Sequence, residues 1–488
     1  MKVSQTHGVE AGAEEEEGGV ARMADTAREC TARECRTVGT DGANHVRGGH
    51  RMSMQTNPKS SETVPSVGAG GLLVVTVDRL PAWMLAAYGA TWVATPAIDS
   101  LAARGVVFDR LITPSPAAGD TLHGLLTAER PDGPSLLSAA AVRGWRPVVV
   151  TDDAAVAAEM TAAGSRPEVE VRLVEALAKE GSEEDDTRTN IARLVDAALE
   201  TIASQDHRLV WCHVGSLGVA WDAAERYRDR YVDPEDPPPP SGARVPGAAV
   251  DADTDPDLVV GIRQVFAGQI TLLDSQLGRL FAAVQESQSA ASGPWTVLVV
   301  GVRGLPLGLH GWIGLGGPEL PYGELIHVPA IFVDAGGRMA AQRFGGLVVP
   351  ADLGATLADL LRQANGVPSA ASSVDPSTPW QGASLSPLFE DWSATLRDRV
   401  VVSGEGGAAL VTPAWHGLLH ARGGEARTKP AADGRLRLFA KPDDFFELAD
   451  VANRCANVAG PLELLLEQVN AGDRRAAWLA ALPDKIGE

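Results

Sequence analysis

The chain has 488 residues, of which 45% are hydrophobic, and a formal net charge of −21 at pH 7. Its length is sufficient for one large domain and a smaller one, and its hydrophobic content is ordinary for a globular protein. The negative charge argues against a nucleic-acid partner and against binding to a membrane of anionic lipid, because both attract basic surfaces. No apolar segment of the sequence reaches the roughly 18 residues that span a bilayer.

Residues 1–68 have the composition of a disordered tail. They include the run Glu14 to Glu17 and many Gly, Ser and Thr residues, with few side chains that could form a core. The pentapeptide Thr-Ala-Arg-Glu-Cys occurs twice in tandem over 26–35, which a short functional motif would also explain. We interpret the region as a low-complexity tail or as an over-extended gene start, in which case Met52 or Met54 is the true start.

The sequence predicts a cytoplasmic protein without a disulfide framework. Neither Met1 nor Met52 is followed by the basic and apolar regions of a secretory signal. Two of the four cysteines lie in the tail, and Cys212 lies in an apolar segment typical of a core strand.

The first predicted element is a buried parallel strand over Gly71 to Asp78. Its residues are mostly apolar and rich in Val, and it ends in a carboxylate, at the edge where open α/β sheets place their sites. Thr95 to Gly105 is predicted to be a helix with Pro at its first position, and Val106 to Ile112 a second strand. Thr113 to Pro116 then turns into an apolar helical segment over Leu122 to Ala128.

Residues 69–365 alternate between strand and helix patterns. This alternation predicts an α/β domain with a mostly parallel central sheet and helices on both faces. One helix, over 257–286, has apolar residues at intervals of three and four, as expected for a single buried stripe. Further strands are predicted at Arg146–Thr151, Leu209–His213, Thr296–Val300 and Val328–Val333.

Two insertions in this domain are expected to be surface loops. One is the acidic run near Glu180 to Asp186. The other is the Pro- and Asp-rich segment Tyr231 to Asp257, which is expected to be extended and poorly packed.

A linker over 366–381 and a small C-terminal subdomain over 382–488 are predicted to complete the chain. The subdomain is expected to be α+β, with antiparallel strands over 399–403 and 408–412. A helix over 461–482 is expected to close it.

The order of these segments resembles that of the sulfatase family, within the alkaline-phosphatase superfamily. In that family a strand ends in a metal-binding Asp, a helix and a strand follow, and a TPSP turn leads to the nucleophile at a helix N-terminus. The resemblance extends from about Gly71 to about Leu388 and implies the sulfatase α/β fold. Its matching segments are Thr113–Pro116, the helix Phe266–Leu280, Leu307–Gly311, Tyr322–Pro329 and Gly382–Leu388.

The resemblance also implies a chemistry whose residues are missing from this sequence. Sulfatases oxidise a cysteine to formylglycine, whose hydrate attacks sulfur, while an Arg of the same C-x-P-S-R motif and the helix N-terminus hold the anion. Counted from the TPSP turn, the nucleophile position is Ala118 and the Arg position is Leu122. A methyl group cannot attack and a Leu cannot hold a sulfate, so we predict a degenerate catalytic centre.

Further ester contacts of the family are changed on the same alignment. Its substrate-binding His falls on Gly218, the Glu of its GEHG signature on Leu309, and its substrate Lys on Leu315. His310 remains, and we interpret it either as a leftover site residue or as a packing residue. His327 is predicted to be structural.

The metal-binding positions implied by the resemblance are changed as well. A Ca²⁺ or Mg²⁺ ion needs several oxygen ligands. The family's second ligand strand corresponds to Val299–Gly304, with Val302 in place of the acid and Arg303 beside it, which leaves Asp78 as the sole candidate ligand. We therefore expect no cofactor. Our hypothesis is that Arg303 forms an ion pair with Asp78 at the former metal position, and the alternative is that Arg303 points to solvent.

These positions predict a catalytically inactive, sulfatase-like protein that acts by binding an unknown protein partner or a small anionic ligand. The alternative is an active sulfate- or phosphate-ester hydrolase that uses Thr121 as its nucleophile and a reduced Ca²⁺ or Mg²⁺ site, because the superfamily includes Thr and Ser nucleophiles. Thr121 has Asp120 and His123 beside it. The structural interpretation is that Asp120 or Thr121 caps the helix.

The surroundings of Asp78 are expected to separate the two functions. A hydrolase needs an open, polar cleft at the strand ends. An inactive protein can have this cleft filled by Leu122, Val302 and Leu309.

Overall fold

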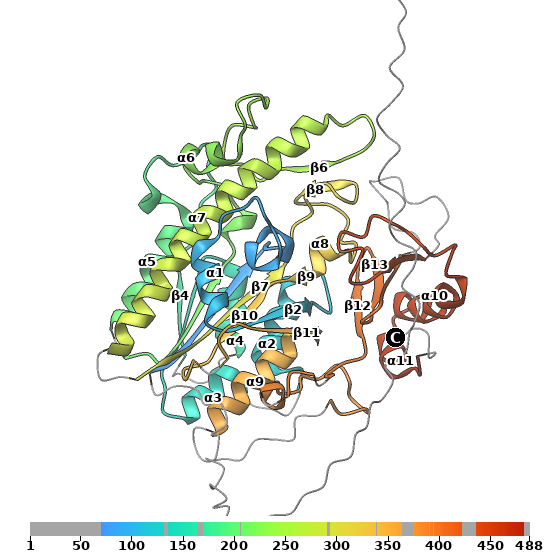
Figure 1. Ribbon diagram of the computed structural model, residues 1–488. Helices are drawn as coiled ribbons and strands as arrows, with labels where there is room; N and C mark the ends of the chain where they lie inside the picture. Colours follow the sequence, from blue (N-terminus) through green and yellow to red (C-terminus); the bar gives the residue numbers. More distant parts are fainter. Residues whose placement is uncertain are drawn as a thin grey trace, which may run out of the picture. The chain divides into compact units, whose positions relative to one another are not determined.

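The computed structural model describes ten segments of the chain (Figure 1). They are residues 70–130, 135–163, 169–204, 206–289, 293–337, 339–363, 374–389, 391–393, 395–421 and 436–482. The predicted tail over 1–68 lies outside the described residues, and so do residues 366–373 of the predicted linker. Among the described residues, no helix is both long and apolar enough to cross a membrane.

Nine strands of the described residues make one central sheet. Its spatial order is β11-β2-β10-β7-β1-β5-β3-β4, with β9 paired to β2. The central strand β1 runs parallel to both β5 and β7, and β10 and β9 are antiparallel to their neighbours, so the predicted mostly parallel sheet is confirmed. The strands are β1 (Gly71–Asp78), β2 (Val106–Ile112), β3 (Pro147–Thr151), β4 (Glu170–Leu173), β5 (Leu209–Val214), β7 (Trp295–Arg303), β9 (His327–Val328), β10 (Ala330–Val333) and β11 (Gln342–Val348).

Helices cover both faces of this sheet. Successive side chains of a strand point to opposite faces, so a strand that is apolar throughout has two apolar faces to bury. In β1, Leu73 and Val75 contact one apolar core, and Leu72 and Val74 contact the other. The first core contains side chains of α1 (Pro96–Ala103), α5 (Asn190–Ala203) and α7 (Pro256–Ser289). The second contains side chains of α2 (Ala118–Thr127), α3 (Leu136–Val142), α4 (Ala154–Ala163) and α9 (Pro350–Gln363). A strand buried on both faces has to be continuously apolar, and for this reason β1 was recognisable in the sequence.

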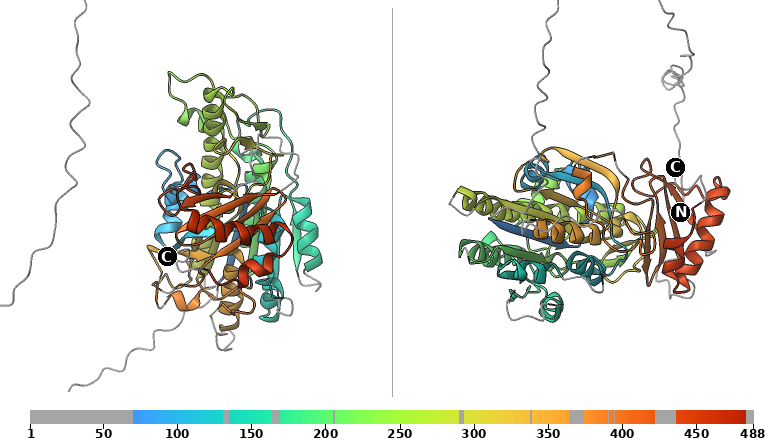
Figure 2. Two further views of the ribbon diagram at one scale, coloured as in Figure 1. Left: turned by 90° about the vertical axis from the view of Figure 1, so that its right-hand side faces the viewer. Right: turned by 90° about the horizontal axis from the view of Figure 1, so that it is seen from below.

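A second, antiparallel sheet of four described strands follows near the C-terminus, with α10 and α11 on its outer face (Figure 2). Its core includes Ile112 of β2 and Leu347 of β11, so the two sheets share buried side chains. Its elements are β12 (Val400–Gly404), β13 (Gly407–Val411), β14 (Trp415–His420), β15 (Arg437–Ala440), α10 (Ala456–Asn470) and α11 (Arg474–Leu479).

The prediction of one closing helix over 461–482 is wrong. The chain forms α10 and α11 instead, and α10 begins five residues before Pro461. Gly472 lies between the two helices with φ 97°, a left-handed conformation that glycine adopts without strain. Asp473 then caps α11 by accepting a hydrogen bond from the backbone N–H of Ala476.

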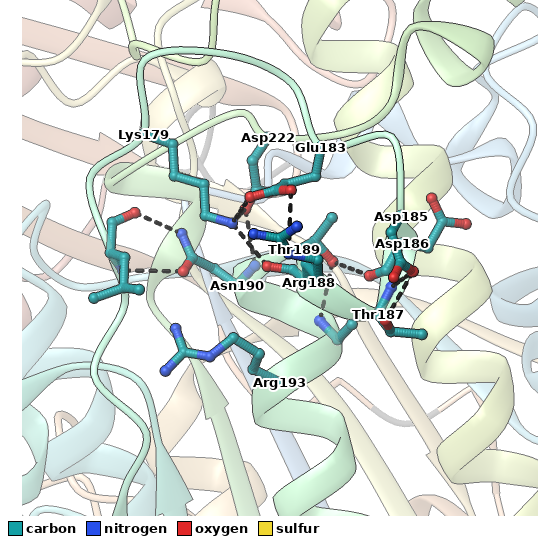
Figure 3. A network of polar contacts seen from close by, with 12 residues as sticks. Lys179, Glu183, Asp185, Asp186, Thr187, Arg188, Thr189, Asn190, Arg193 and Asp222 are labelled. Atoms are coloured by element: carbon teal, nitrogen blue, oxygen red, sulfur yellow. Dashed lines mark hydrogen bonds and ion pairs between the residues drawn. The ribbon is translucent and has the colours of Figure 1, made fainter.

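The acidic run Glu180 to Asp186 is a surface segment, as predicted, and its side chains take part in a polar network (Figure 3). Lys179 Nζ lies 2.6 Å from Glu183 Oε1 and 3.5 Å from Asp222 Oδ2, and it donates to the carbonyl oxygen of Arg188. The buried Asp222 accepts a further hydrogen bond from the N–H of Asn190, at the start of α5. The network therefore fixes this segment to a helix N-terminus, where a carboxylate is favourable.

The prediction that Tyr231 to Asp257 is a poorly packed surface loop is confirmed for most of its residues, which are exposed or half-buried, but the segment has two features that were not predicted. Ala243 and Val245 are buried. The segment contains β6 (Gly247–Ala249), which pairs with β8 (Trp312–Gly314). The Pro residues predicted an extended backbone, but they could not reveal a strand partner more than sixty residues later in the chain.

Candidate functional site

Asp78 and Arg303 lie side by side at the carboxyl ends of the two central strands. The pairing of β1 with β7 is regular up to Val77, which is opposite Gly301. It then shifts, so that Asp78 is opposite Arg303 rather than Val302. An irregularity of this kind re-aims the side chains that follow it. Here it brings a guanidinium, and not a valine, to the carboxylate.

The two side chains form a bidentate ion pair. Arg303 Nε donates to Asp78 Oδ1 at 2.9 Å, and Arg303 Nη2 donates to Asp78 Oδ2 at 3.1 Å. Only 9% of the Asp78 side chain and 17% of the Arg303 side chain are exposed. Two parallel N–H···O bonds are the geometry in which arginine holds a carboxylate most strongly. The hypothesis of an Arg303–Asp78 ion pair is confirmed.

A second arginine lies against the same carboxylate. Arg79 Nε is 3.8 Å from Asp78 Oδ2, which is too far for a hydrogen bond, and it is buried without a partner among the described residues. Burial lowers the pKa of Arg79. A Cβ added at Gly218 would lie 3.4 Å from Arg79 Nε. The side chain of Arg79 thus occupies the space beside Gly218. The resemblance aligns Gly218 with the substrate-binding His of the sulfatases.

These residues do not fit a divalent cation. Both oxygens of Asp78 already accept hydrogen bonds from Arg303, and Arg79 adds a second positive charge next to them. Within the part of the chain that the structure describes, no group of three or more His, Cys, Asp or Glu side chains is arranged to hold a metal ion. A Ca²⁺ or Mg²⁺ ion at Asp78 would have to displace the guanidinium of Arg303. It would then be bound by a single carboxylate, whereas such an ion needs several oxygen ligands.

The residues around the predicted nucleophile position lie on α2, and most of them face the core. Leu122 and Val302 have no solvent exposure and belong to the same apolar core, while Ala118 packs against it. Thr121 is also fully buried, and its Oγ1 has no hydrogen-bond partner among the described residues.

The prediction that Asp120 or Thr121 caps this helix is wrong. The N-cap is Ala117, which has no side chain to accept a hydrogen bond, and α2 begins at Ala118. Asp120 instead lies in the first turn, is exposed, and lines a separate cavity of about 240 Å³ with Arg474 and Trp478. The structure therefore does not bring Asp120 together with Asp78.

The fold has been solved before in other proteins. It is similar to the phosphonate monoester hydrolase of Agrobacterium radiobacter, with a TM-score of 0.62, 17% sequence identity, and coverage of 84% of this chain and 96% of that one. The phosphonate monoester hydrolase of Silicibacter pomeroyi has a TM-score of 0.55 and 16% identity, with 83% and 95% of the two chains covered. A protein of Bacteroides fragilis assigned to the sulfatases has a TM-score of 0.55 and 14% identity, with 87% and 100% covered. The chain has the sulfatase fold.

The similarity is one of structure alone. No protein-family model matches the sequence, and no curated protein does. The resemblance inferred from the short motifs is thus confirmed at the level of the fold, over most of the chain.

The resemblance aligns His310 and Leu309 with the GEHG signature, but among the described residues neither forms a hydrogen bond or ion pair with Asp78. The His310 ring stacks on Tyr322, with ring centroids 3.8 Å apart and an interplanar angle of 7°. Burial lowers the pKa of His310 to about 4, so the ring is neutral near pH 7. Leu309 is half-buried. The geometry gives His310 a packing contact with Tyr322.

A second buried acid, which was not predicted from the sequence, lies at this edge of the sheet. Asp152 follows β3 directly, and its two oxygens accept hydrogen bonds from the backbone N–H groups of Gly215 and Ser216, after β5. Burial raises the pKa of Asp152 to about 6. The signal that singled out Asp78, an acid after a Val-rich strand, is also present at Asp152. Its role is to hold the β5 loop.

Glu324 is a buried acid close to the end of β7. It lies in α8 (Gly323–Ile326), and its Oε2 accepts a hydrogen bond from the N–H of Leu307 at 3.1 Å. Burial raises the pKa of Glu324 to about 8, so its carboxyl group is largely protonated near pH 7. The preceding strand end passes close by, because Gly304 donates its N–H to the carbonyl oxygen of Leu325.

Raising the pH is expected to destabilise the fold through Glu324. The pKa is raised on folding from 4.5 to about 8, so the native state binds the extra proton, and the stability that it contributes is lost as the pH rises through this window. Glu324→Gln keeps an acceptor for Leu307 and cannot ionise. In urea denaturation it should be more stable than the unchanged protein by on the order of 3 kcal/mol at a pH of about 9, and by much less at about 5. Equal pH dependence of the two proteins would show that Glu324 does not ionise in this range.

Proposed function

We propose that this protein is a non-catalytic member of the sulfatase fold that acts by binding a small anionic ligand or a protein partner. One observation carries the proposal, namely the bidentate Arg303–Asp78 pair at the two strand ends where the resemblance expects a metal ion. An ion pair of this geometry neutralises the buried carboxylate, engages both of its oxygens and places a positive charge where a cation would bind.

The residues of α2 support the same function. Ala118 offers no nucleophile, and Leu122, at the position of an anion-binding arginine, packs into the core together with Val302. Three positions that a hydrolase would use thus contribute apolar packing. Arg79 and Arg303 lie at this edge with the carboxylates of Asp78 and Glu319, and Glu319 Oε1 is 3.7 Å from Arg303 Nη1.

The competing function is hydrolysis of a sulfate, phosphate or phosphonate ester with Thr121 as the nucleophile and a reduced Ca²⁺ or Mg²⁺ site. The phosphonate monoester hydrolases among the similar structures favour this function. Against it, Thr121 has no solvent exposure, and no described His, Cys, Asp or Glu lies within hydrogen-bond distance of its Oγ1 to serve as a base.

Metal content and ester hydrolysis test the proposal. After dialysis, the full chain is expected to retain far less than one equivalent of Ca²⁺ or Mg²⁺ by elemental analysis. It is also expected to hydrolyse para-nitrophenyl sulfate, phosphate and phenylphosphonate no faster than a blank. Stoichiometric metal, or hydrolysis that disappears in Thr121→Val, would overturn the proposal in favour of the hydrolase.

A further inference from the structure

A cavity of about 380 Å³ lies between the central sheet and the C-terminal sheet. This volume is within the range of sites that bind small molecules. Its walls come from β2, β9 and β11 on one side, and from β13, β14 and the segment after β15 on the other. Neither Asp78 nor Arg303 lines it, so it is distinct from the sheet edge described above.

The walls of the cavity are largely apolar. They include Ile112, Ile326, Val411 and the ring of Phe445. Tyr88 also lines it, and its hydroxyl group is already engaged by the backbone, because it donates to the carbonyl oxygen of Phe108 or Ala330 and accepts from the N–H of Ala330. Tyr88 therefore offers the cavity its ring. Such walls suit an aromatic body, which packs edge-on or offset against other rings.

His416 and Glu447 form a buried pair in the cavity wall. His416 Nδ1 lies 2.6 Å from Glu447 Oε1, Lys441 Nζ lies 2.9 Å from the same oxygen, and Gly323 donates its N–H to Glu447 Oε2. Burial by itself raises the pKa of Glu447, but His416, Lys441 and the Gly323 amide together hold this pKa well below its usual range. The carboxylate is ionised and fully paired.

The second nitrogen of His416 has no such partner. His416 is 1% exposed, and its Nε2 has no hydrogen-bond partner among the described residues. Buried polar atoms are nearly always hydrogen-bonded in native proteins, either to protein or to a bound molecule. An unpartnered ring nitrogen in the wall of a cavity is therefore consistent with a ligand that carries a hydroxyl or carboxyl oxygen.

The charges around the cavity leave one cation uncompensated. Arg343 forms an ion pair with Asp109, and Lys441 forms one with Glu447. Arg110 donates only to the carbonyl oxygens of Gly345 and Pro413, and it forms no ion pair with a described carboxylate. Burial lowers the pKa of Arg110, while the nearby Asp109, which is itself paired with Arg343, acts in the opposite direction. A half-buried guanidinium without a counter-ion favours a ligand with one negative charge.

We propose that this cavity binds a small aromatic monocarboxylate, with its carboxylate held by Arg110 and its ring against Tyr88, Ile112 and Phe445. The two sheets both contribute to the site, so the ligand joins the α/β part to the C-terminal part. The inference goes beyond the proposed function, because it concerns a different part of the molecule.

Three probes with the same ring and different charge test the ligand class on the full chain. Isothermal titration is expected to detect phenylacetate, and to find binding of the neutral phenylethanol and the cationic phenethylamine at least tenfold weaker. Phenylacetate is also expected to raise the midpoint of thermal unfolding, because it binds only the folded state. Equal binding of the three probes, or no binding of phenylacetate at millimolar concentration, would overturn the proposal.

Variants then assign the charge to Arg110. Arg110→Gln is expected to weaken phenylacetate binding at least tenfold, whereas Arg110→Lys should retain most of it if the variant folds as the unchanged protein does by circular dichroism. The matched control is Arg279→Gln, an exposed arginine paired with Asp196 outside the cavity, which should bind normally. Unchanged affinity in Arg110→Gln would refute the assignment. Metal content and ester hydrolysis do not enter this test, so the failure of one proposal is distinguishable from the failure of the other.

Discussion

Replacing Arg303 by methionine is expected to lower the free energy of unfolding by about 3 kcal/mol. The substitution removes both hydrogen bonds to Asp78 and leaves a carboxylate whose side chain is only 9% exposed without a bonded counter-ion. Methionine preserves most of the side-chain volume, so the loss reports the unpaired charge rather than a cavity. Urea denaturation at neutral pH measures this change in the free energy of unfolding.

Arg79 provides the matched control at the same carboxylate. Its Nε lies 3.8 Å from Asp78 Oδ2 and forms no hydrogen bond, so Arg79→Met should cost about 1 kcal/mol or less. The double variant Asp78→Asn, Arg303→Met should recover much of the loss, because no charge is left unpaired. A loss in Arg303→Met as small as that in Arg79→Met would contradict the structural importance of the pair.

Replacing Arg397 by methionine is expected to destabilise the fold still more, by about 4 kcal/mol. Arg397 forms a bidentate pair with Asp352 of α9, and the exposed fractions of the two side chains are 1% and 0%. Arg397 also donates to the carbonyl oxygens of Pro379 and Gln381, which would lose their partner. The substitution thus leaves two carbonyl groups without a donor and a buried carboxylate without its counter-ion, bonded only by the N–H groups of Val349 and Ala383. Denaturation in urea, followed by circular dichroism, gives the change.

An exposed arginine, Arg279, is the control for the loss of stability in Arg397→Met. Arg279 is paired with Asp196 at 2.7 Å, but 43% and 44% of these side chains are exposed, so Arg279→Met should cost less than about 1 kcal/mol. If Arg397→Met were no more destabilising than Arg279→Met, Asp352 would have to be protonated or relaxed into solvent. Asp352→Asn in the Arg397→Met background should then have no effect.

Residue types at strand ends led to the hypothesis that Asp78 pairs with Arg303, with Arg303 pointing to solvent as the alternative. A strand buried on both faces has to be apolar throughout, so β1 and its terminal carboxylate were visible in the sequence, and so was the strand that carries Arg303. A buried carboxylate without metal ligands needs a counter-ion, and Arg303 was the cation available on the neighbouring strand. The short motifs of the sulfatase resemblance predicted the fold for the same reason, because they mark turns and strand ends that the sheet requires.

Contacts between residues that lie far apart in the sequence could not be predicted from residue types at strand ends. The roles of Asp352 and Arg397 depend on a contact between a helix and a segment beyond the linker, and neither residue was predicted to form it. The short strand β6 in the Pro-rich insertion was not predicted, because its partner β8 lies far along the chain. The break between α10 and α11 depends on one glycine with positive φ, for which the apolar pattern of the two helices gives no sign.

The sequence by itself predicted the strands of the sheet and the carboxylate at the end of β1. It also showed that cysteine, arginine and a second acid are absent at the positions that the resemblance aligns with catalytic and metal-binding residues. These features depend on the type of single residues and on local periodicity. Only the tertiary structure decided that the shift in pairing after Val77 turns Val302 into the core and Arg303 toward Asp78. It also decided that Arg110, His416 and Glu447 meet around one cavity, since their distances depend on how two sheets pack, and side-chain packing between elements far apart in sequence is not encoded in any local pattern.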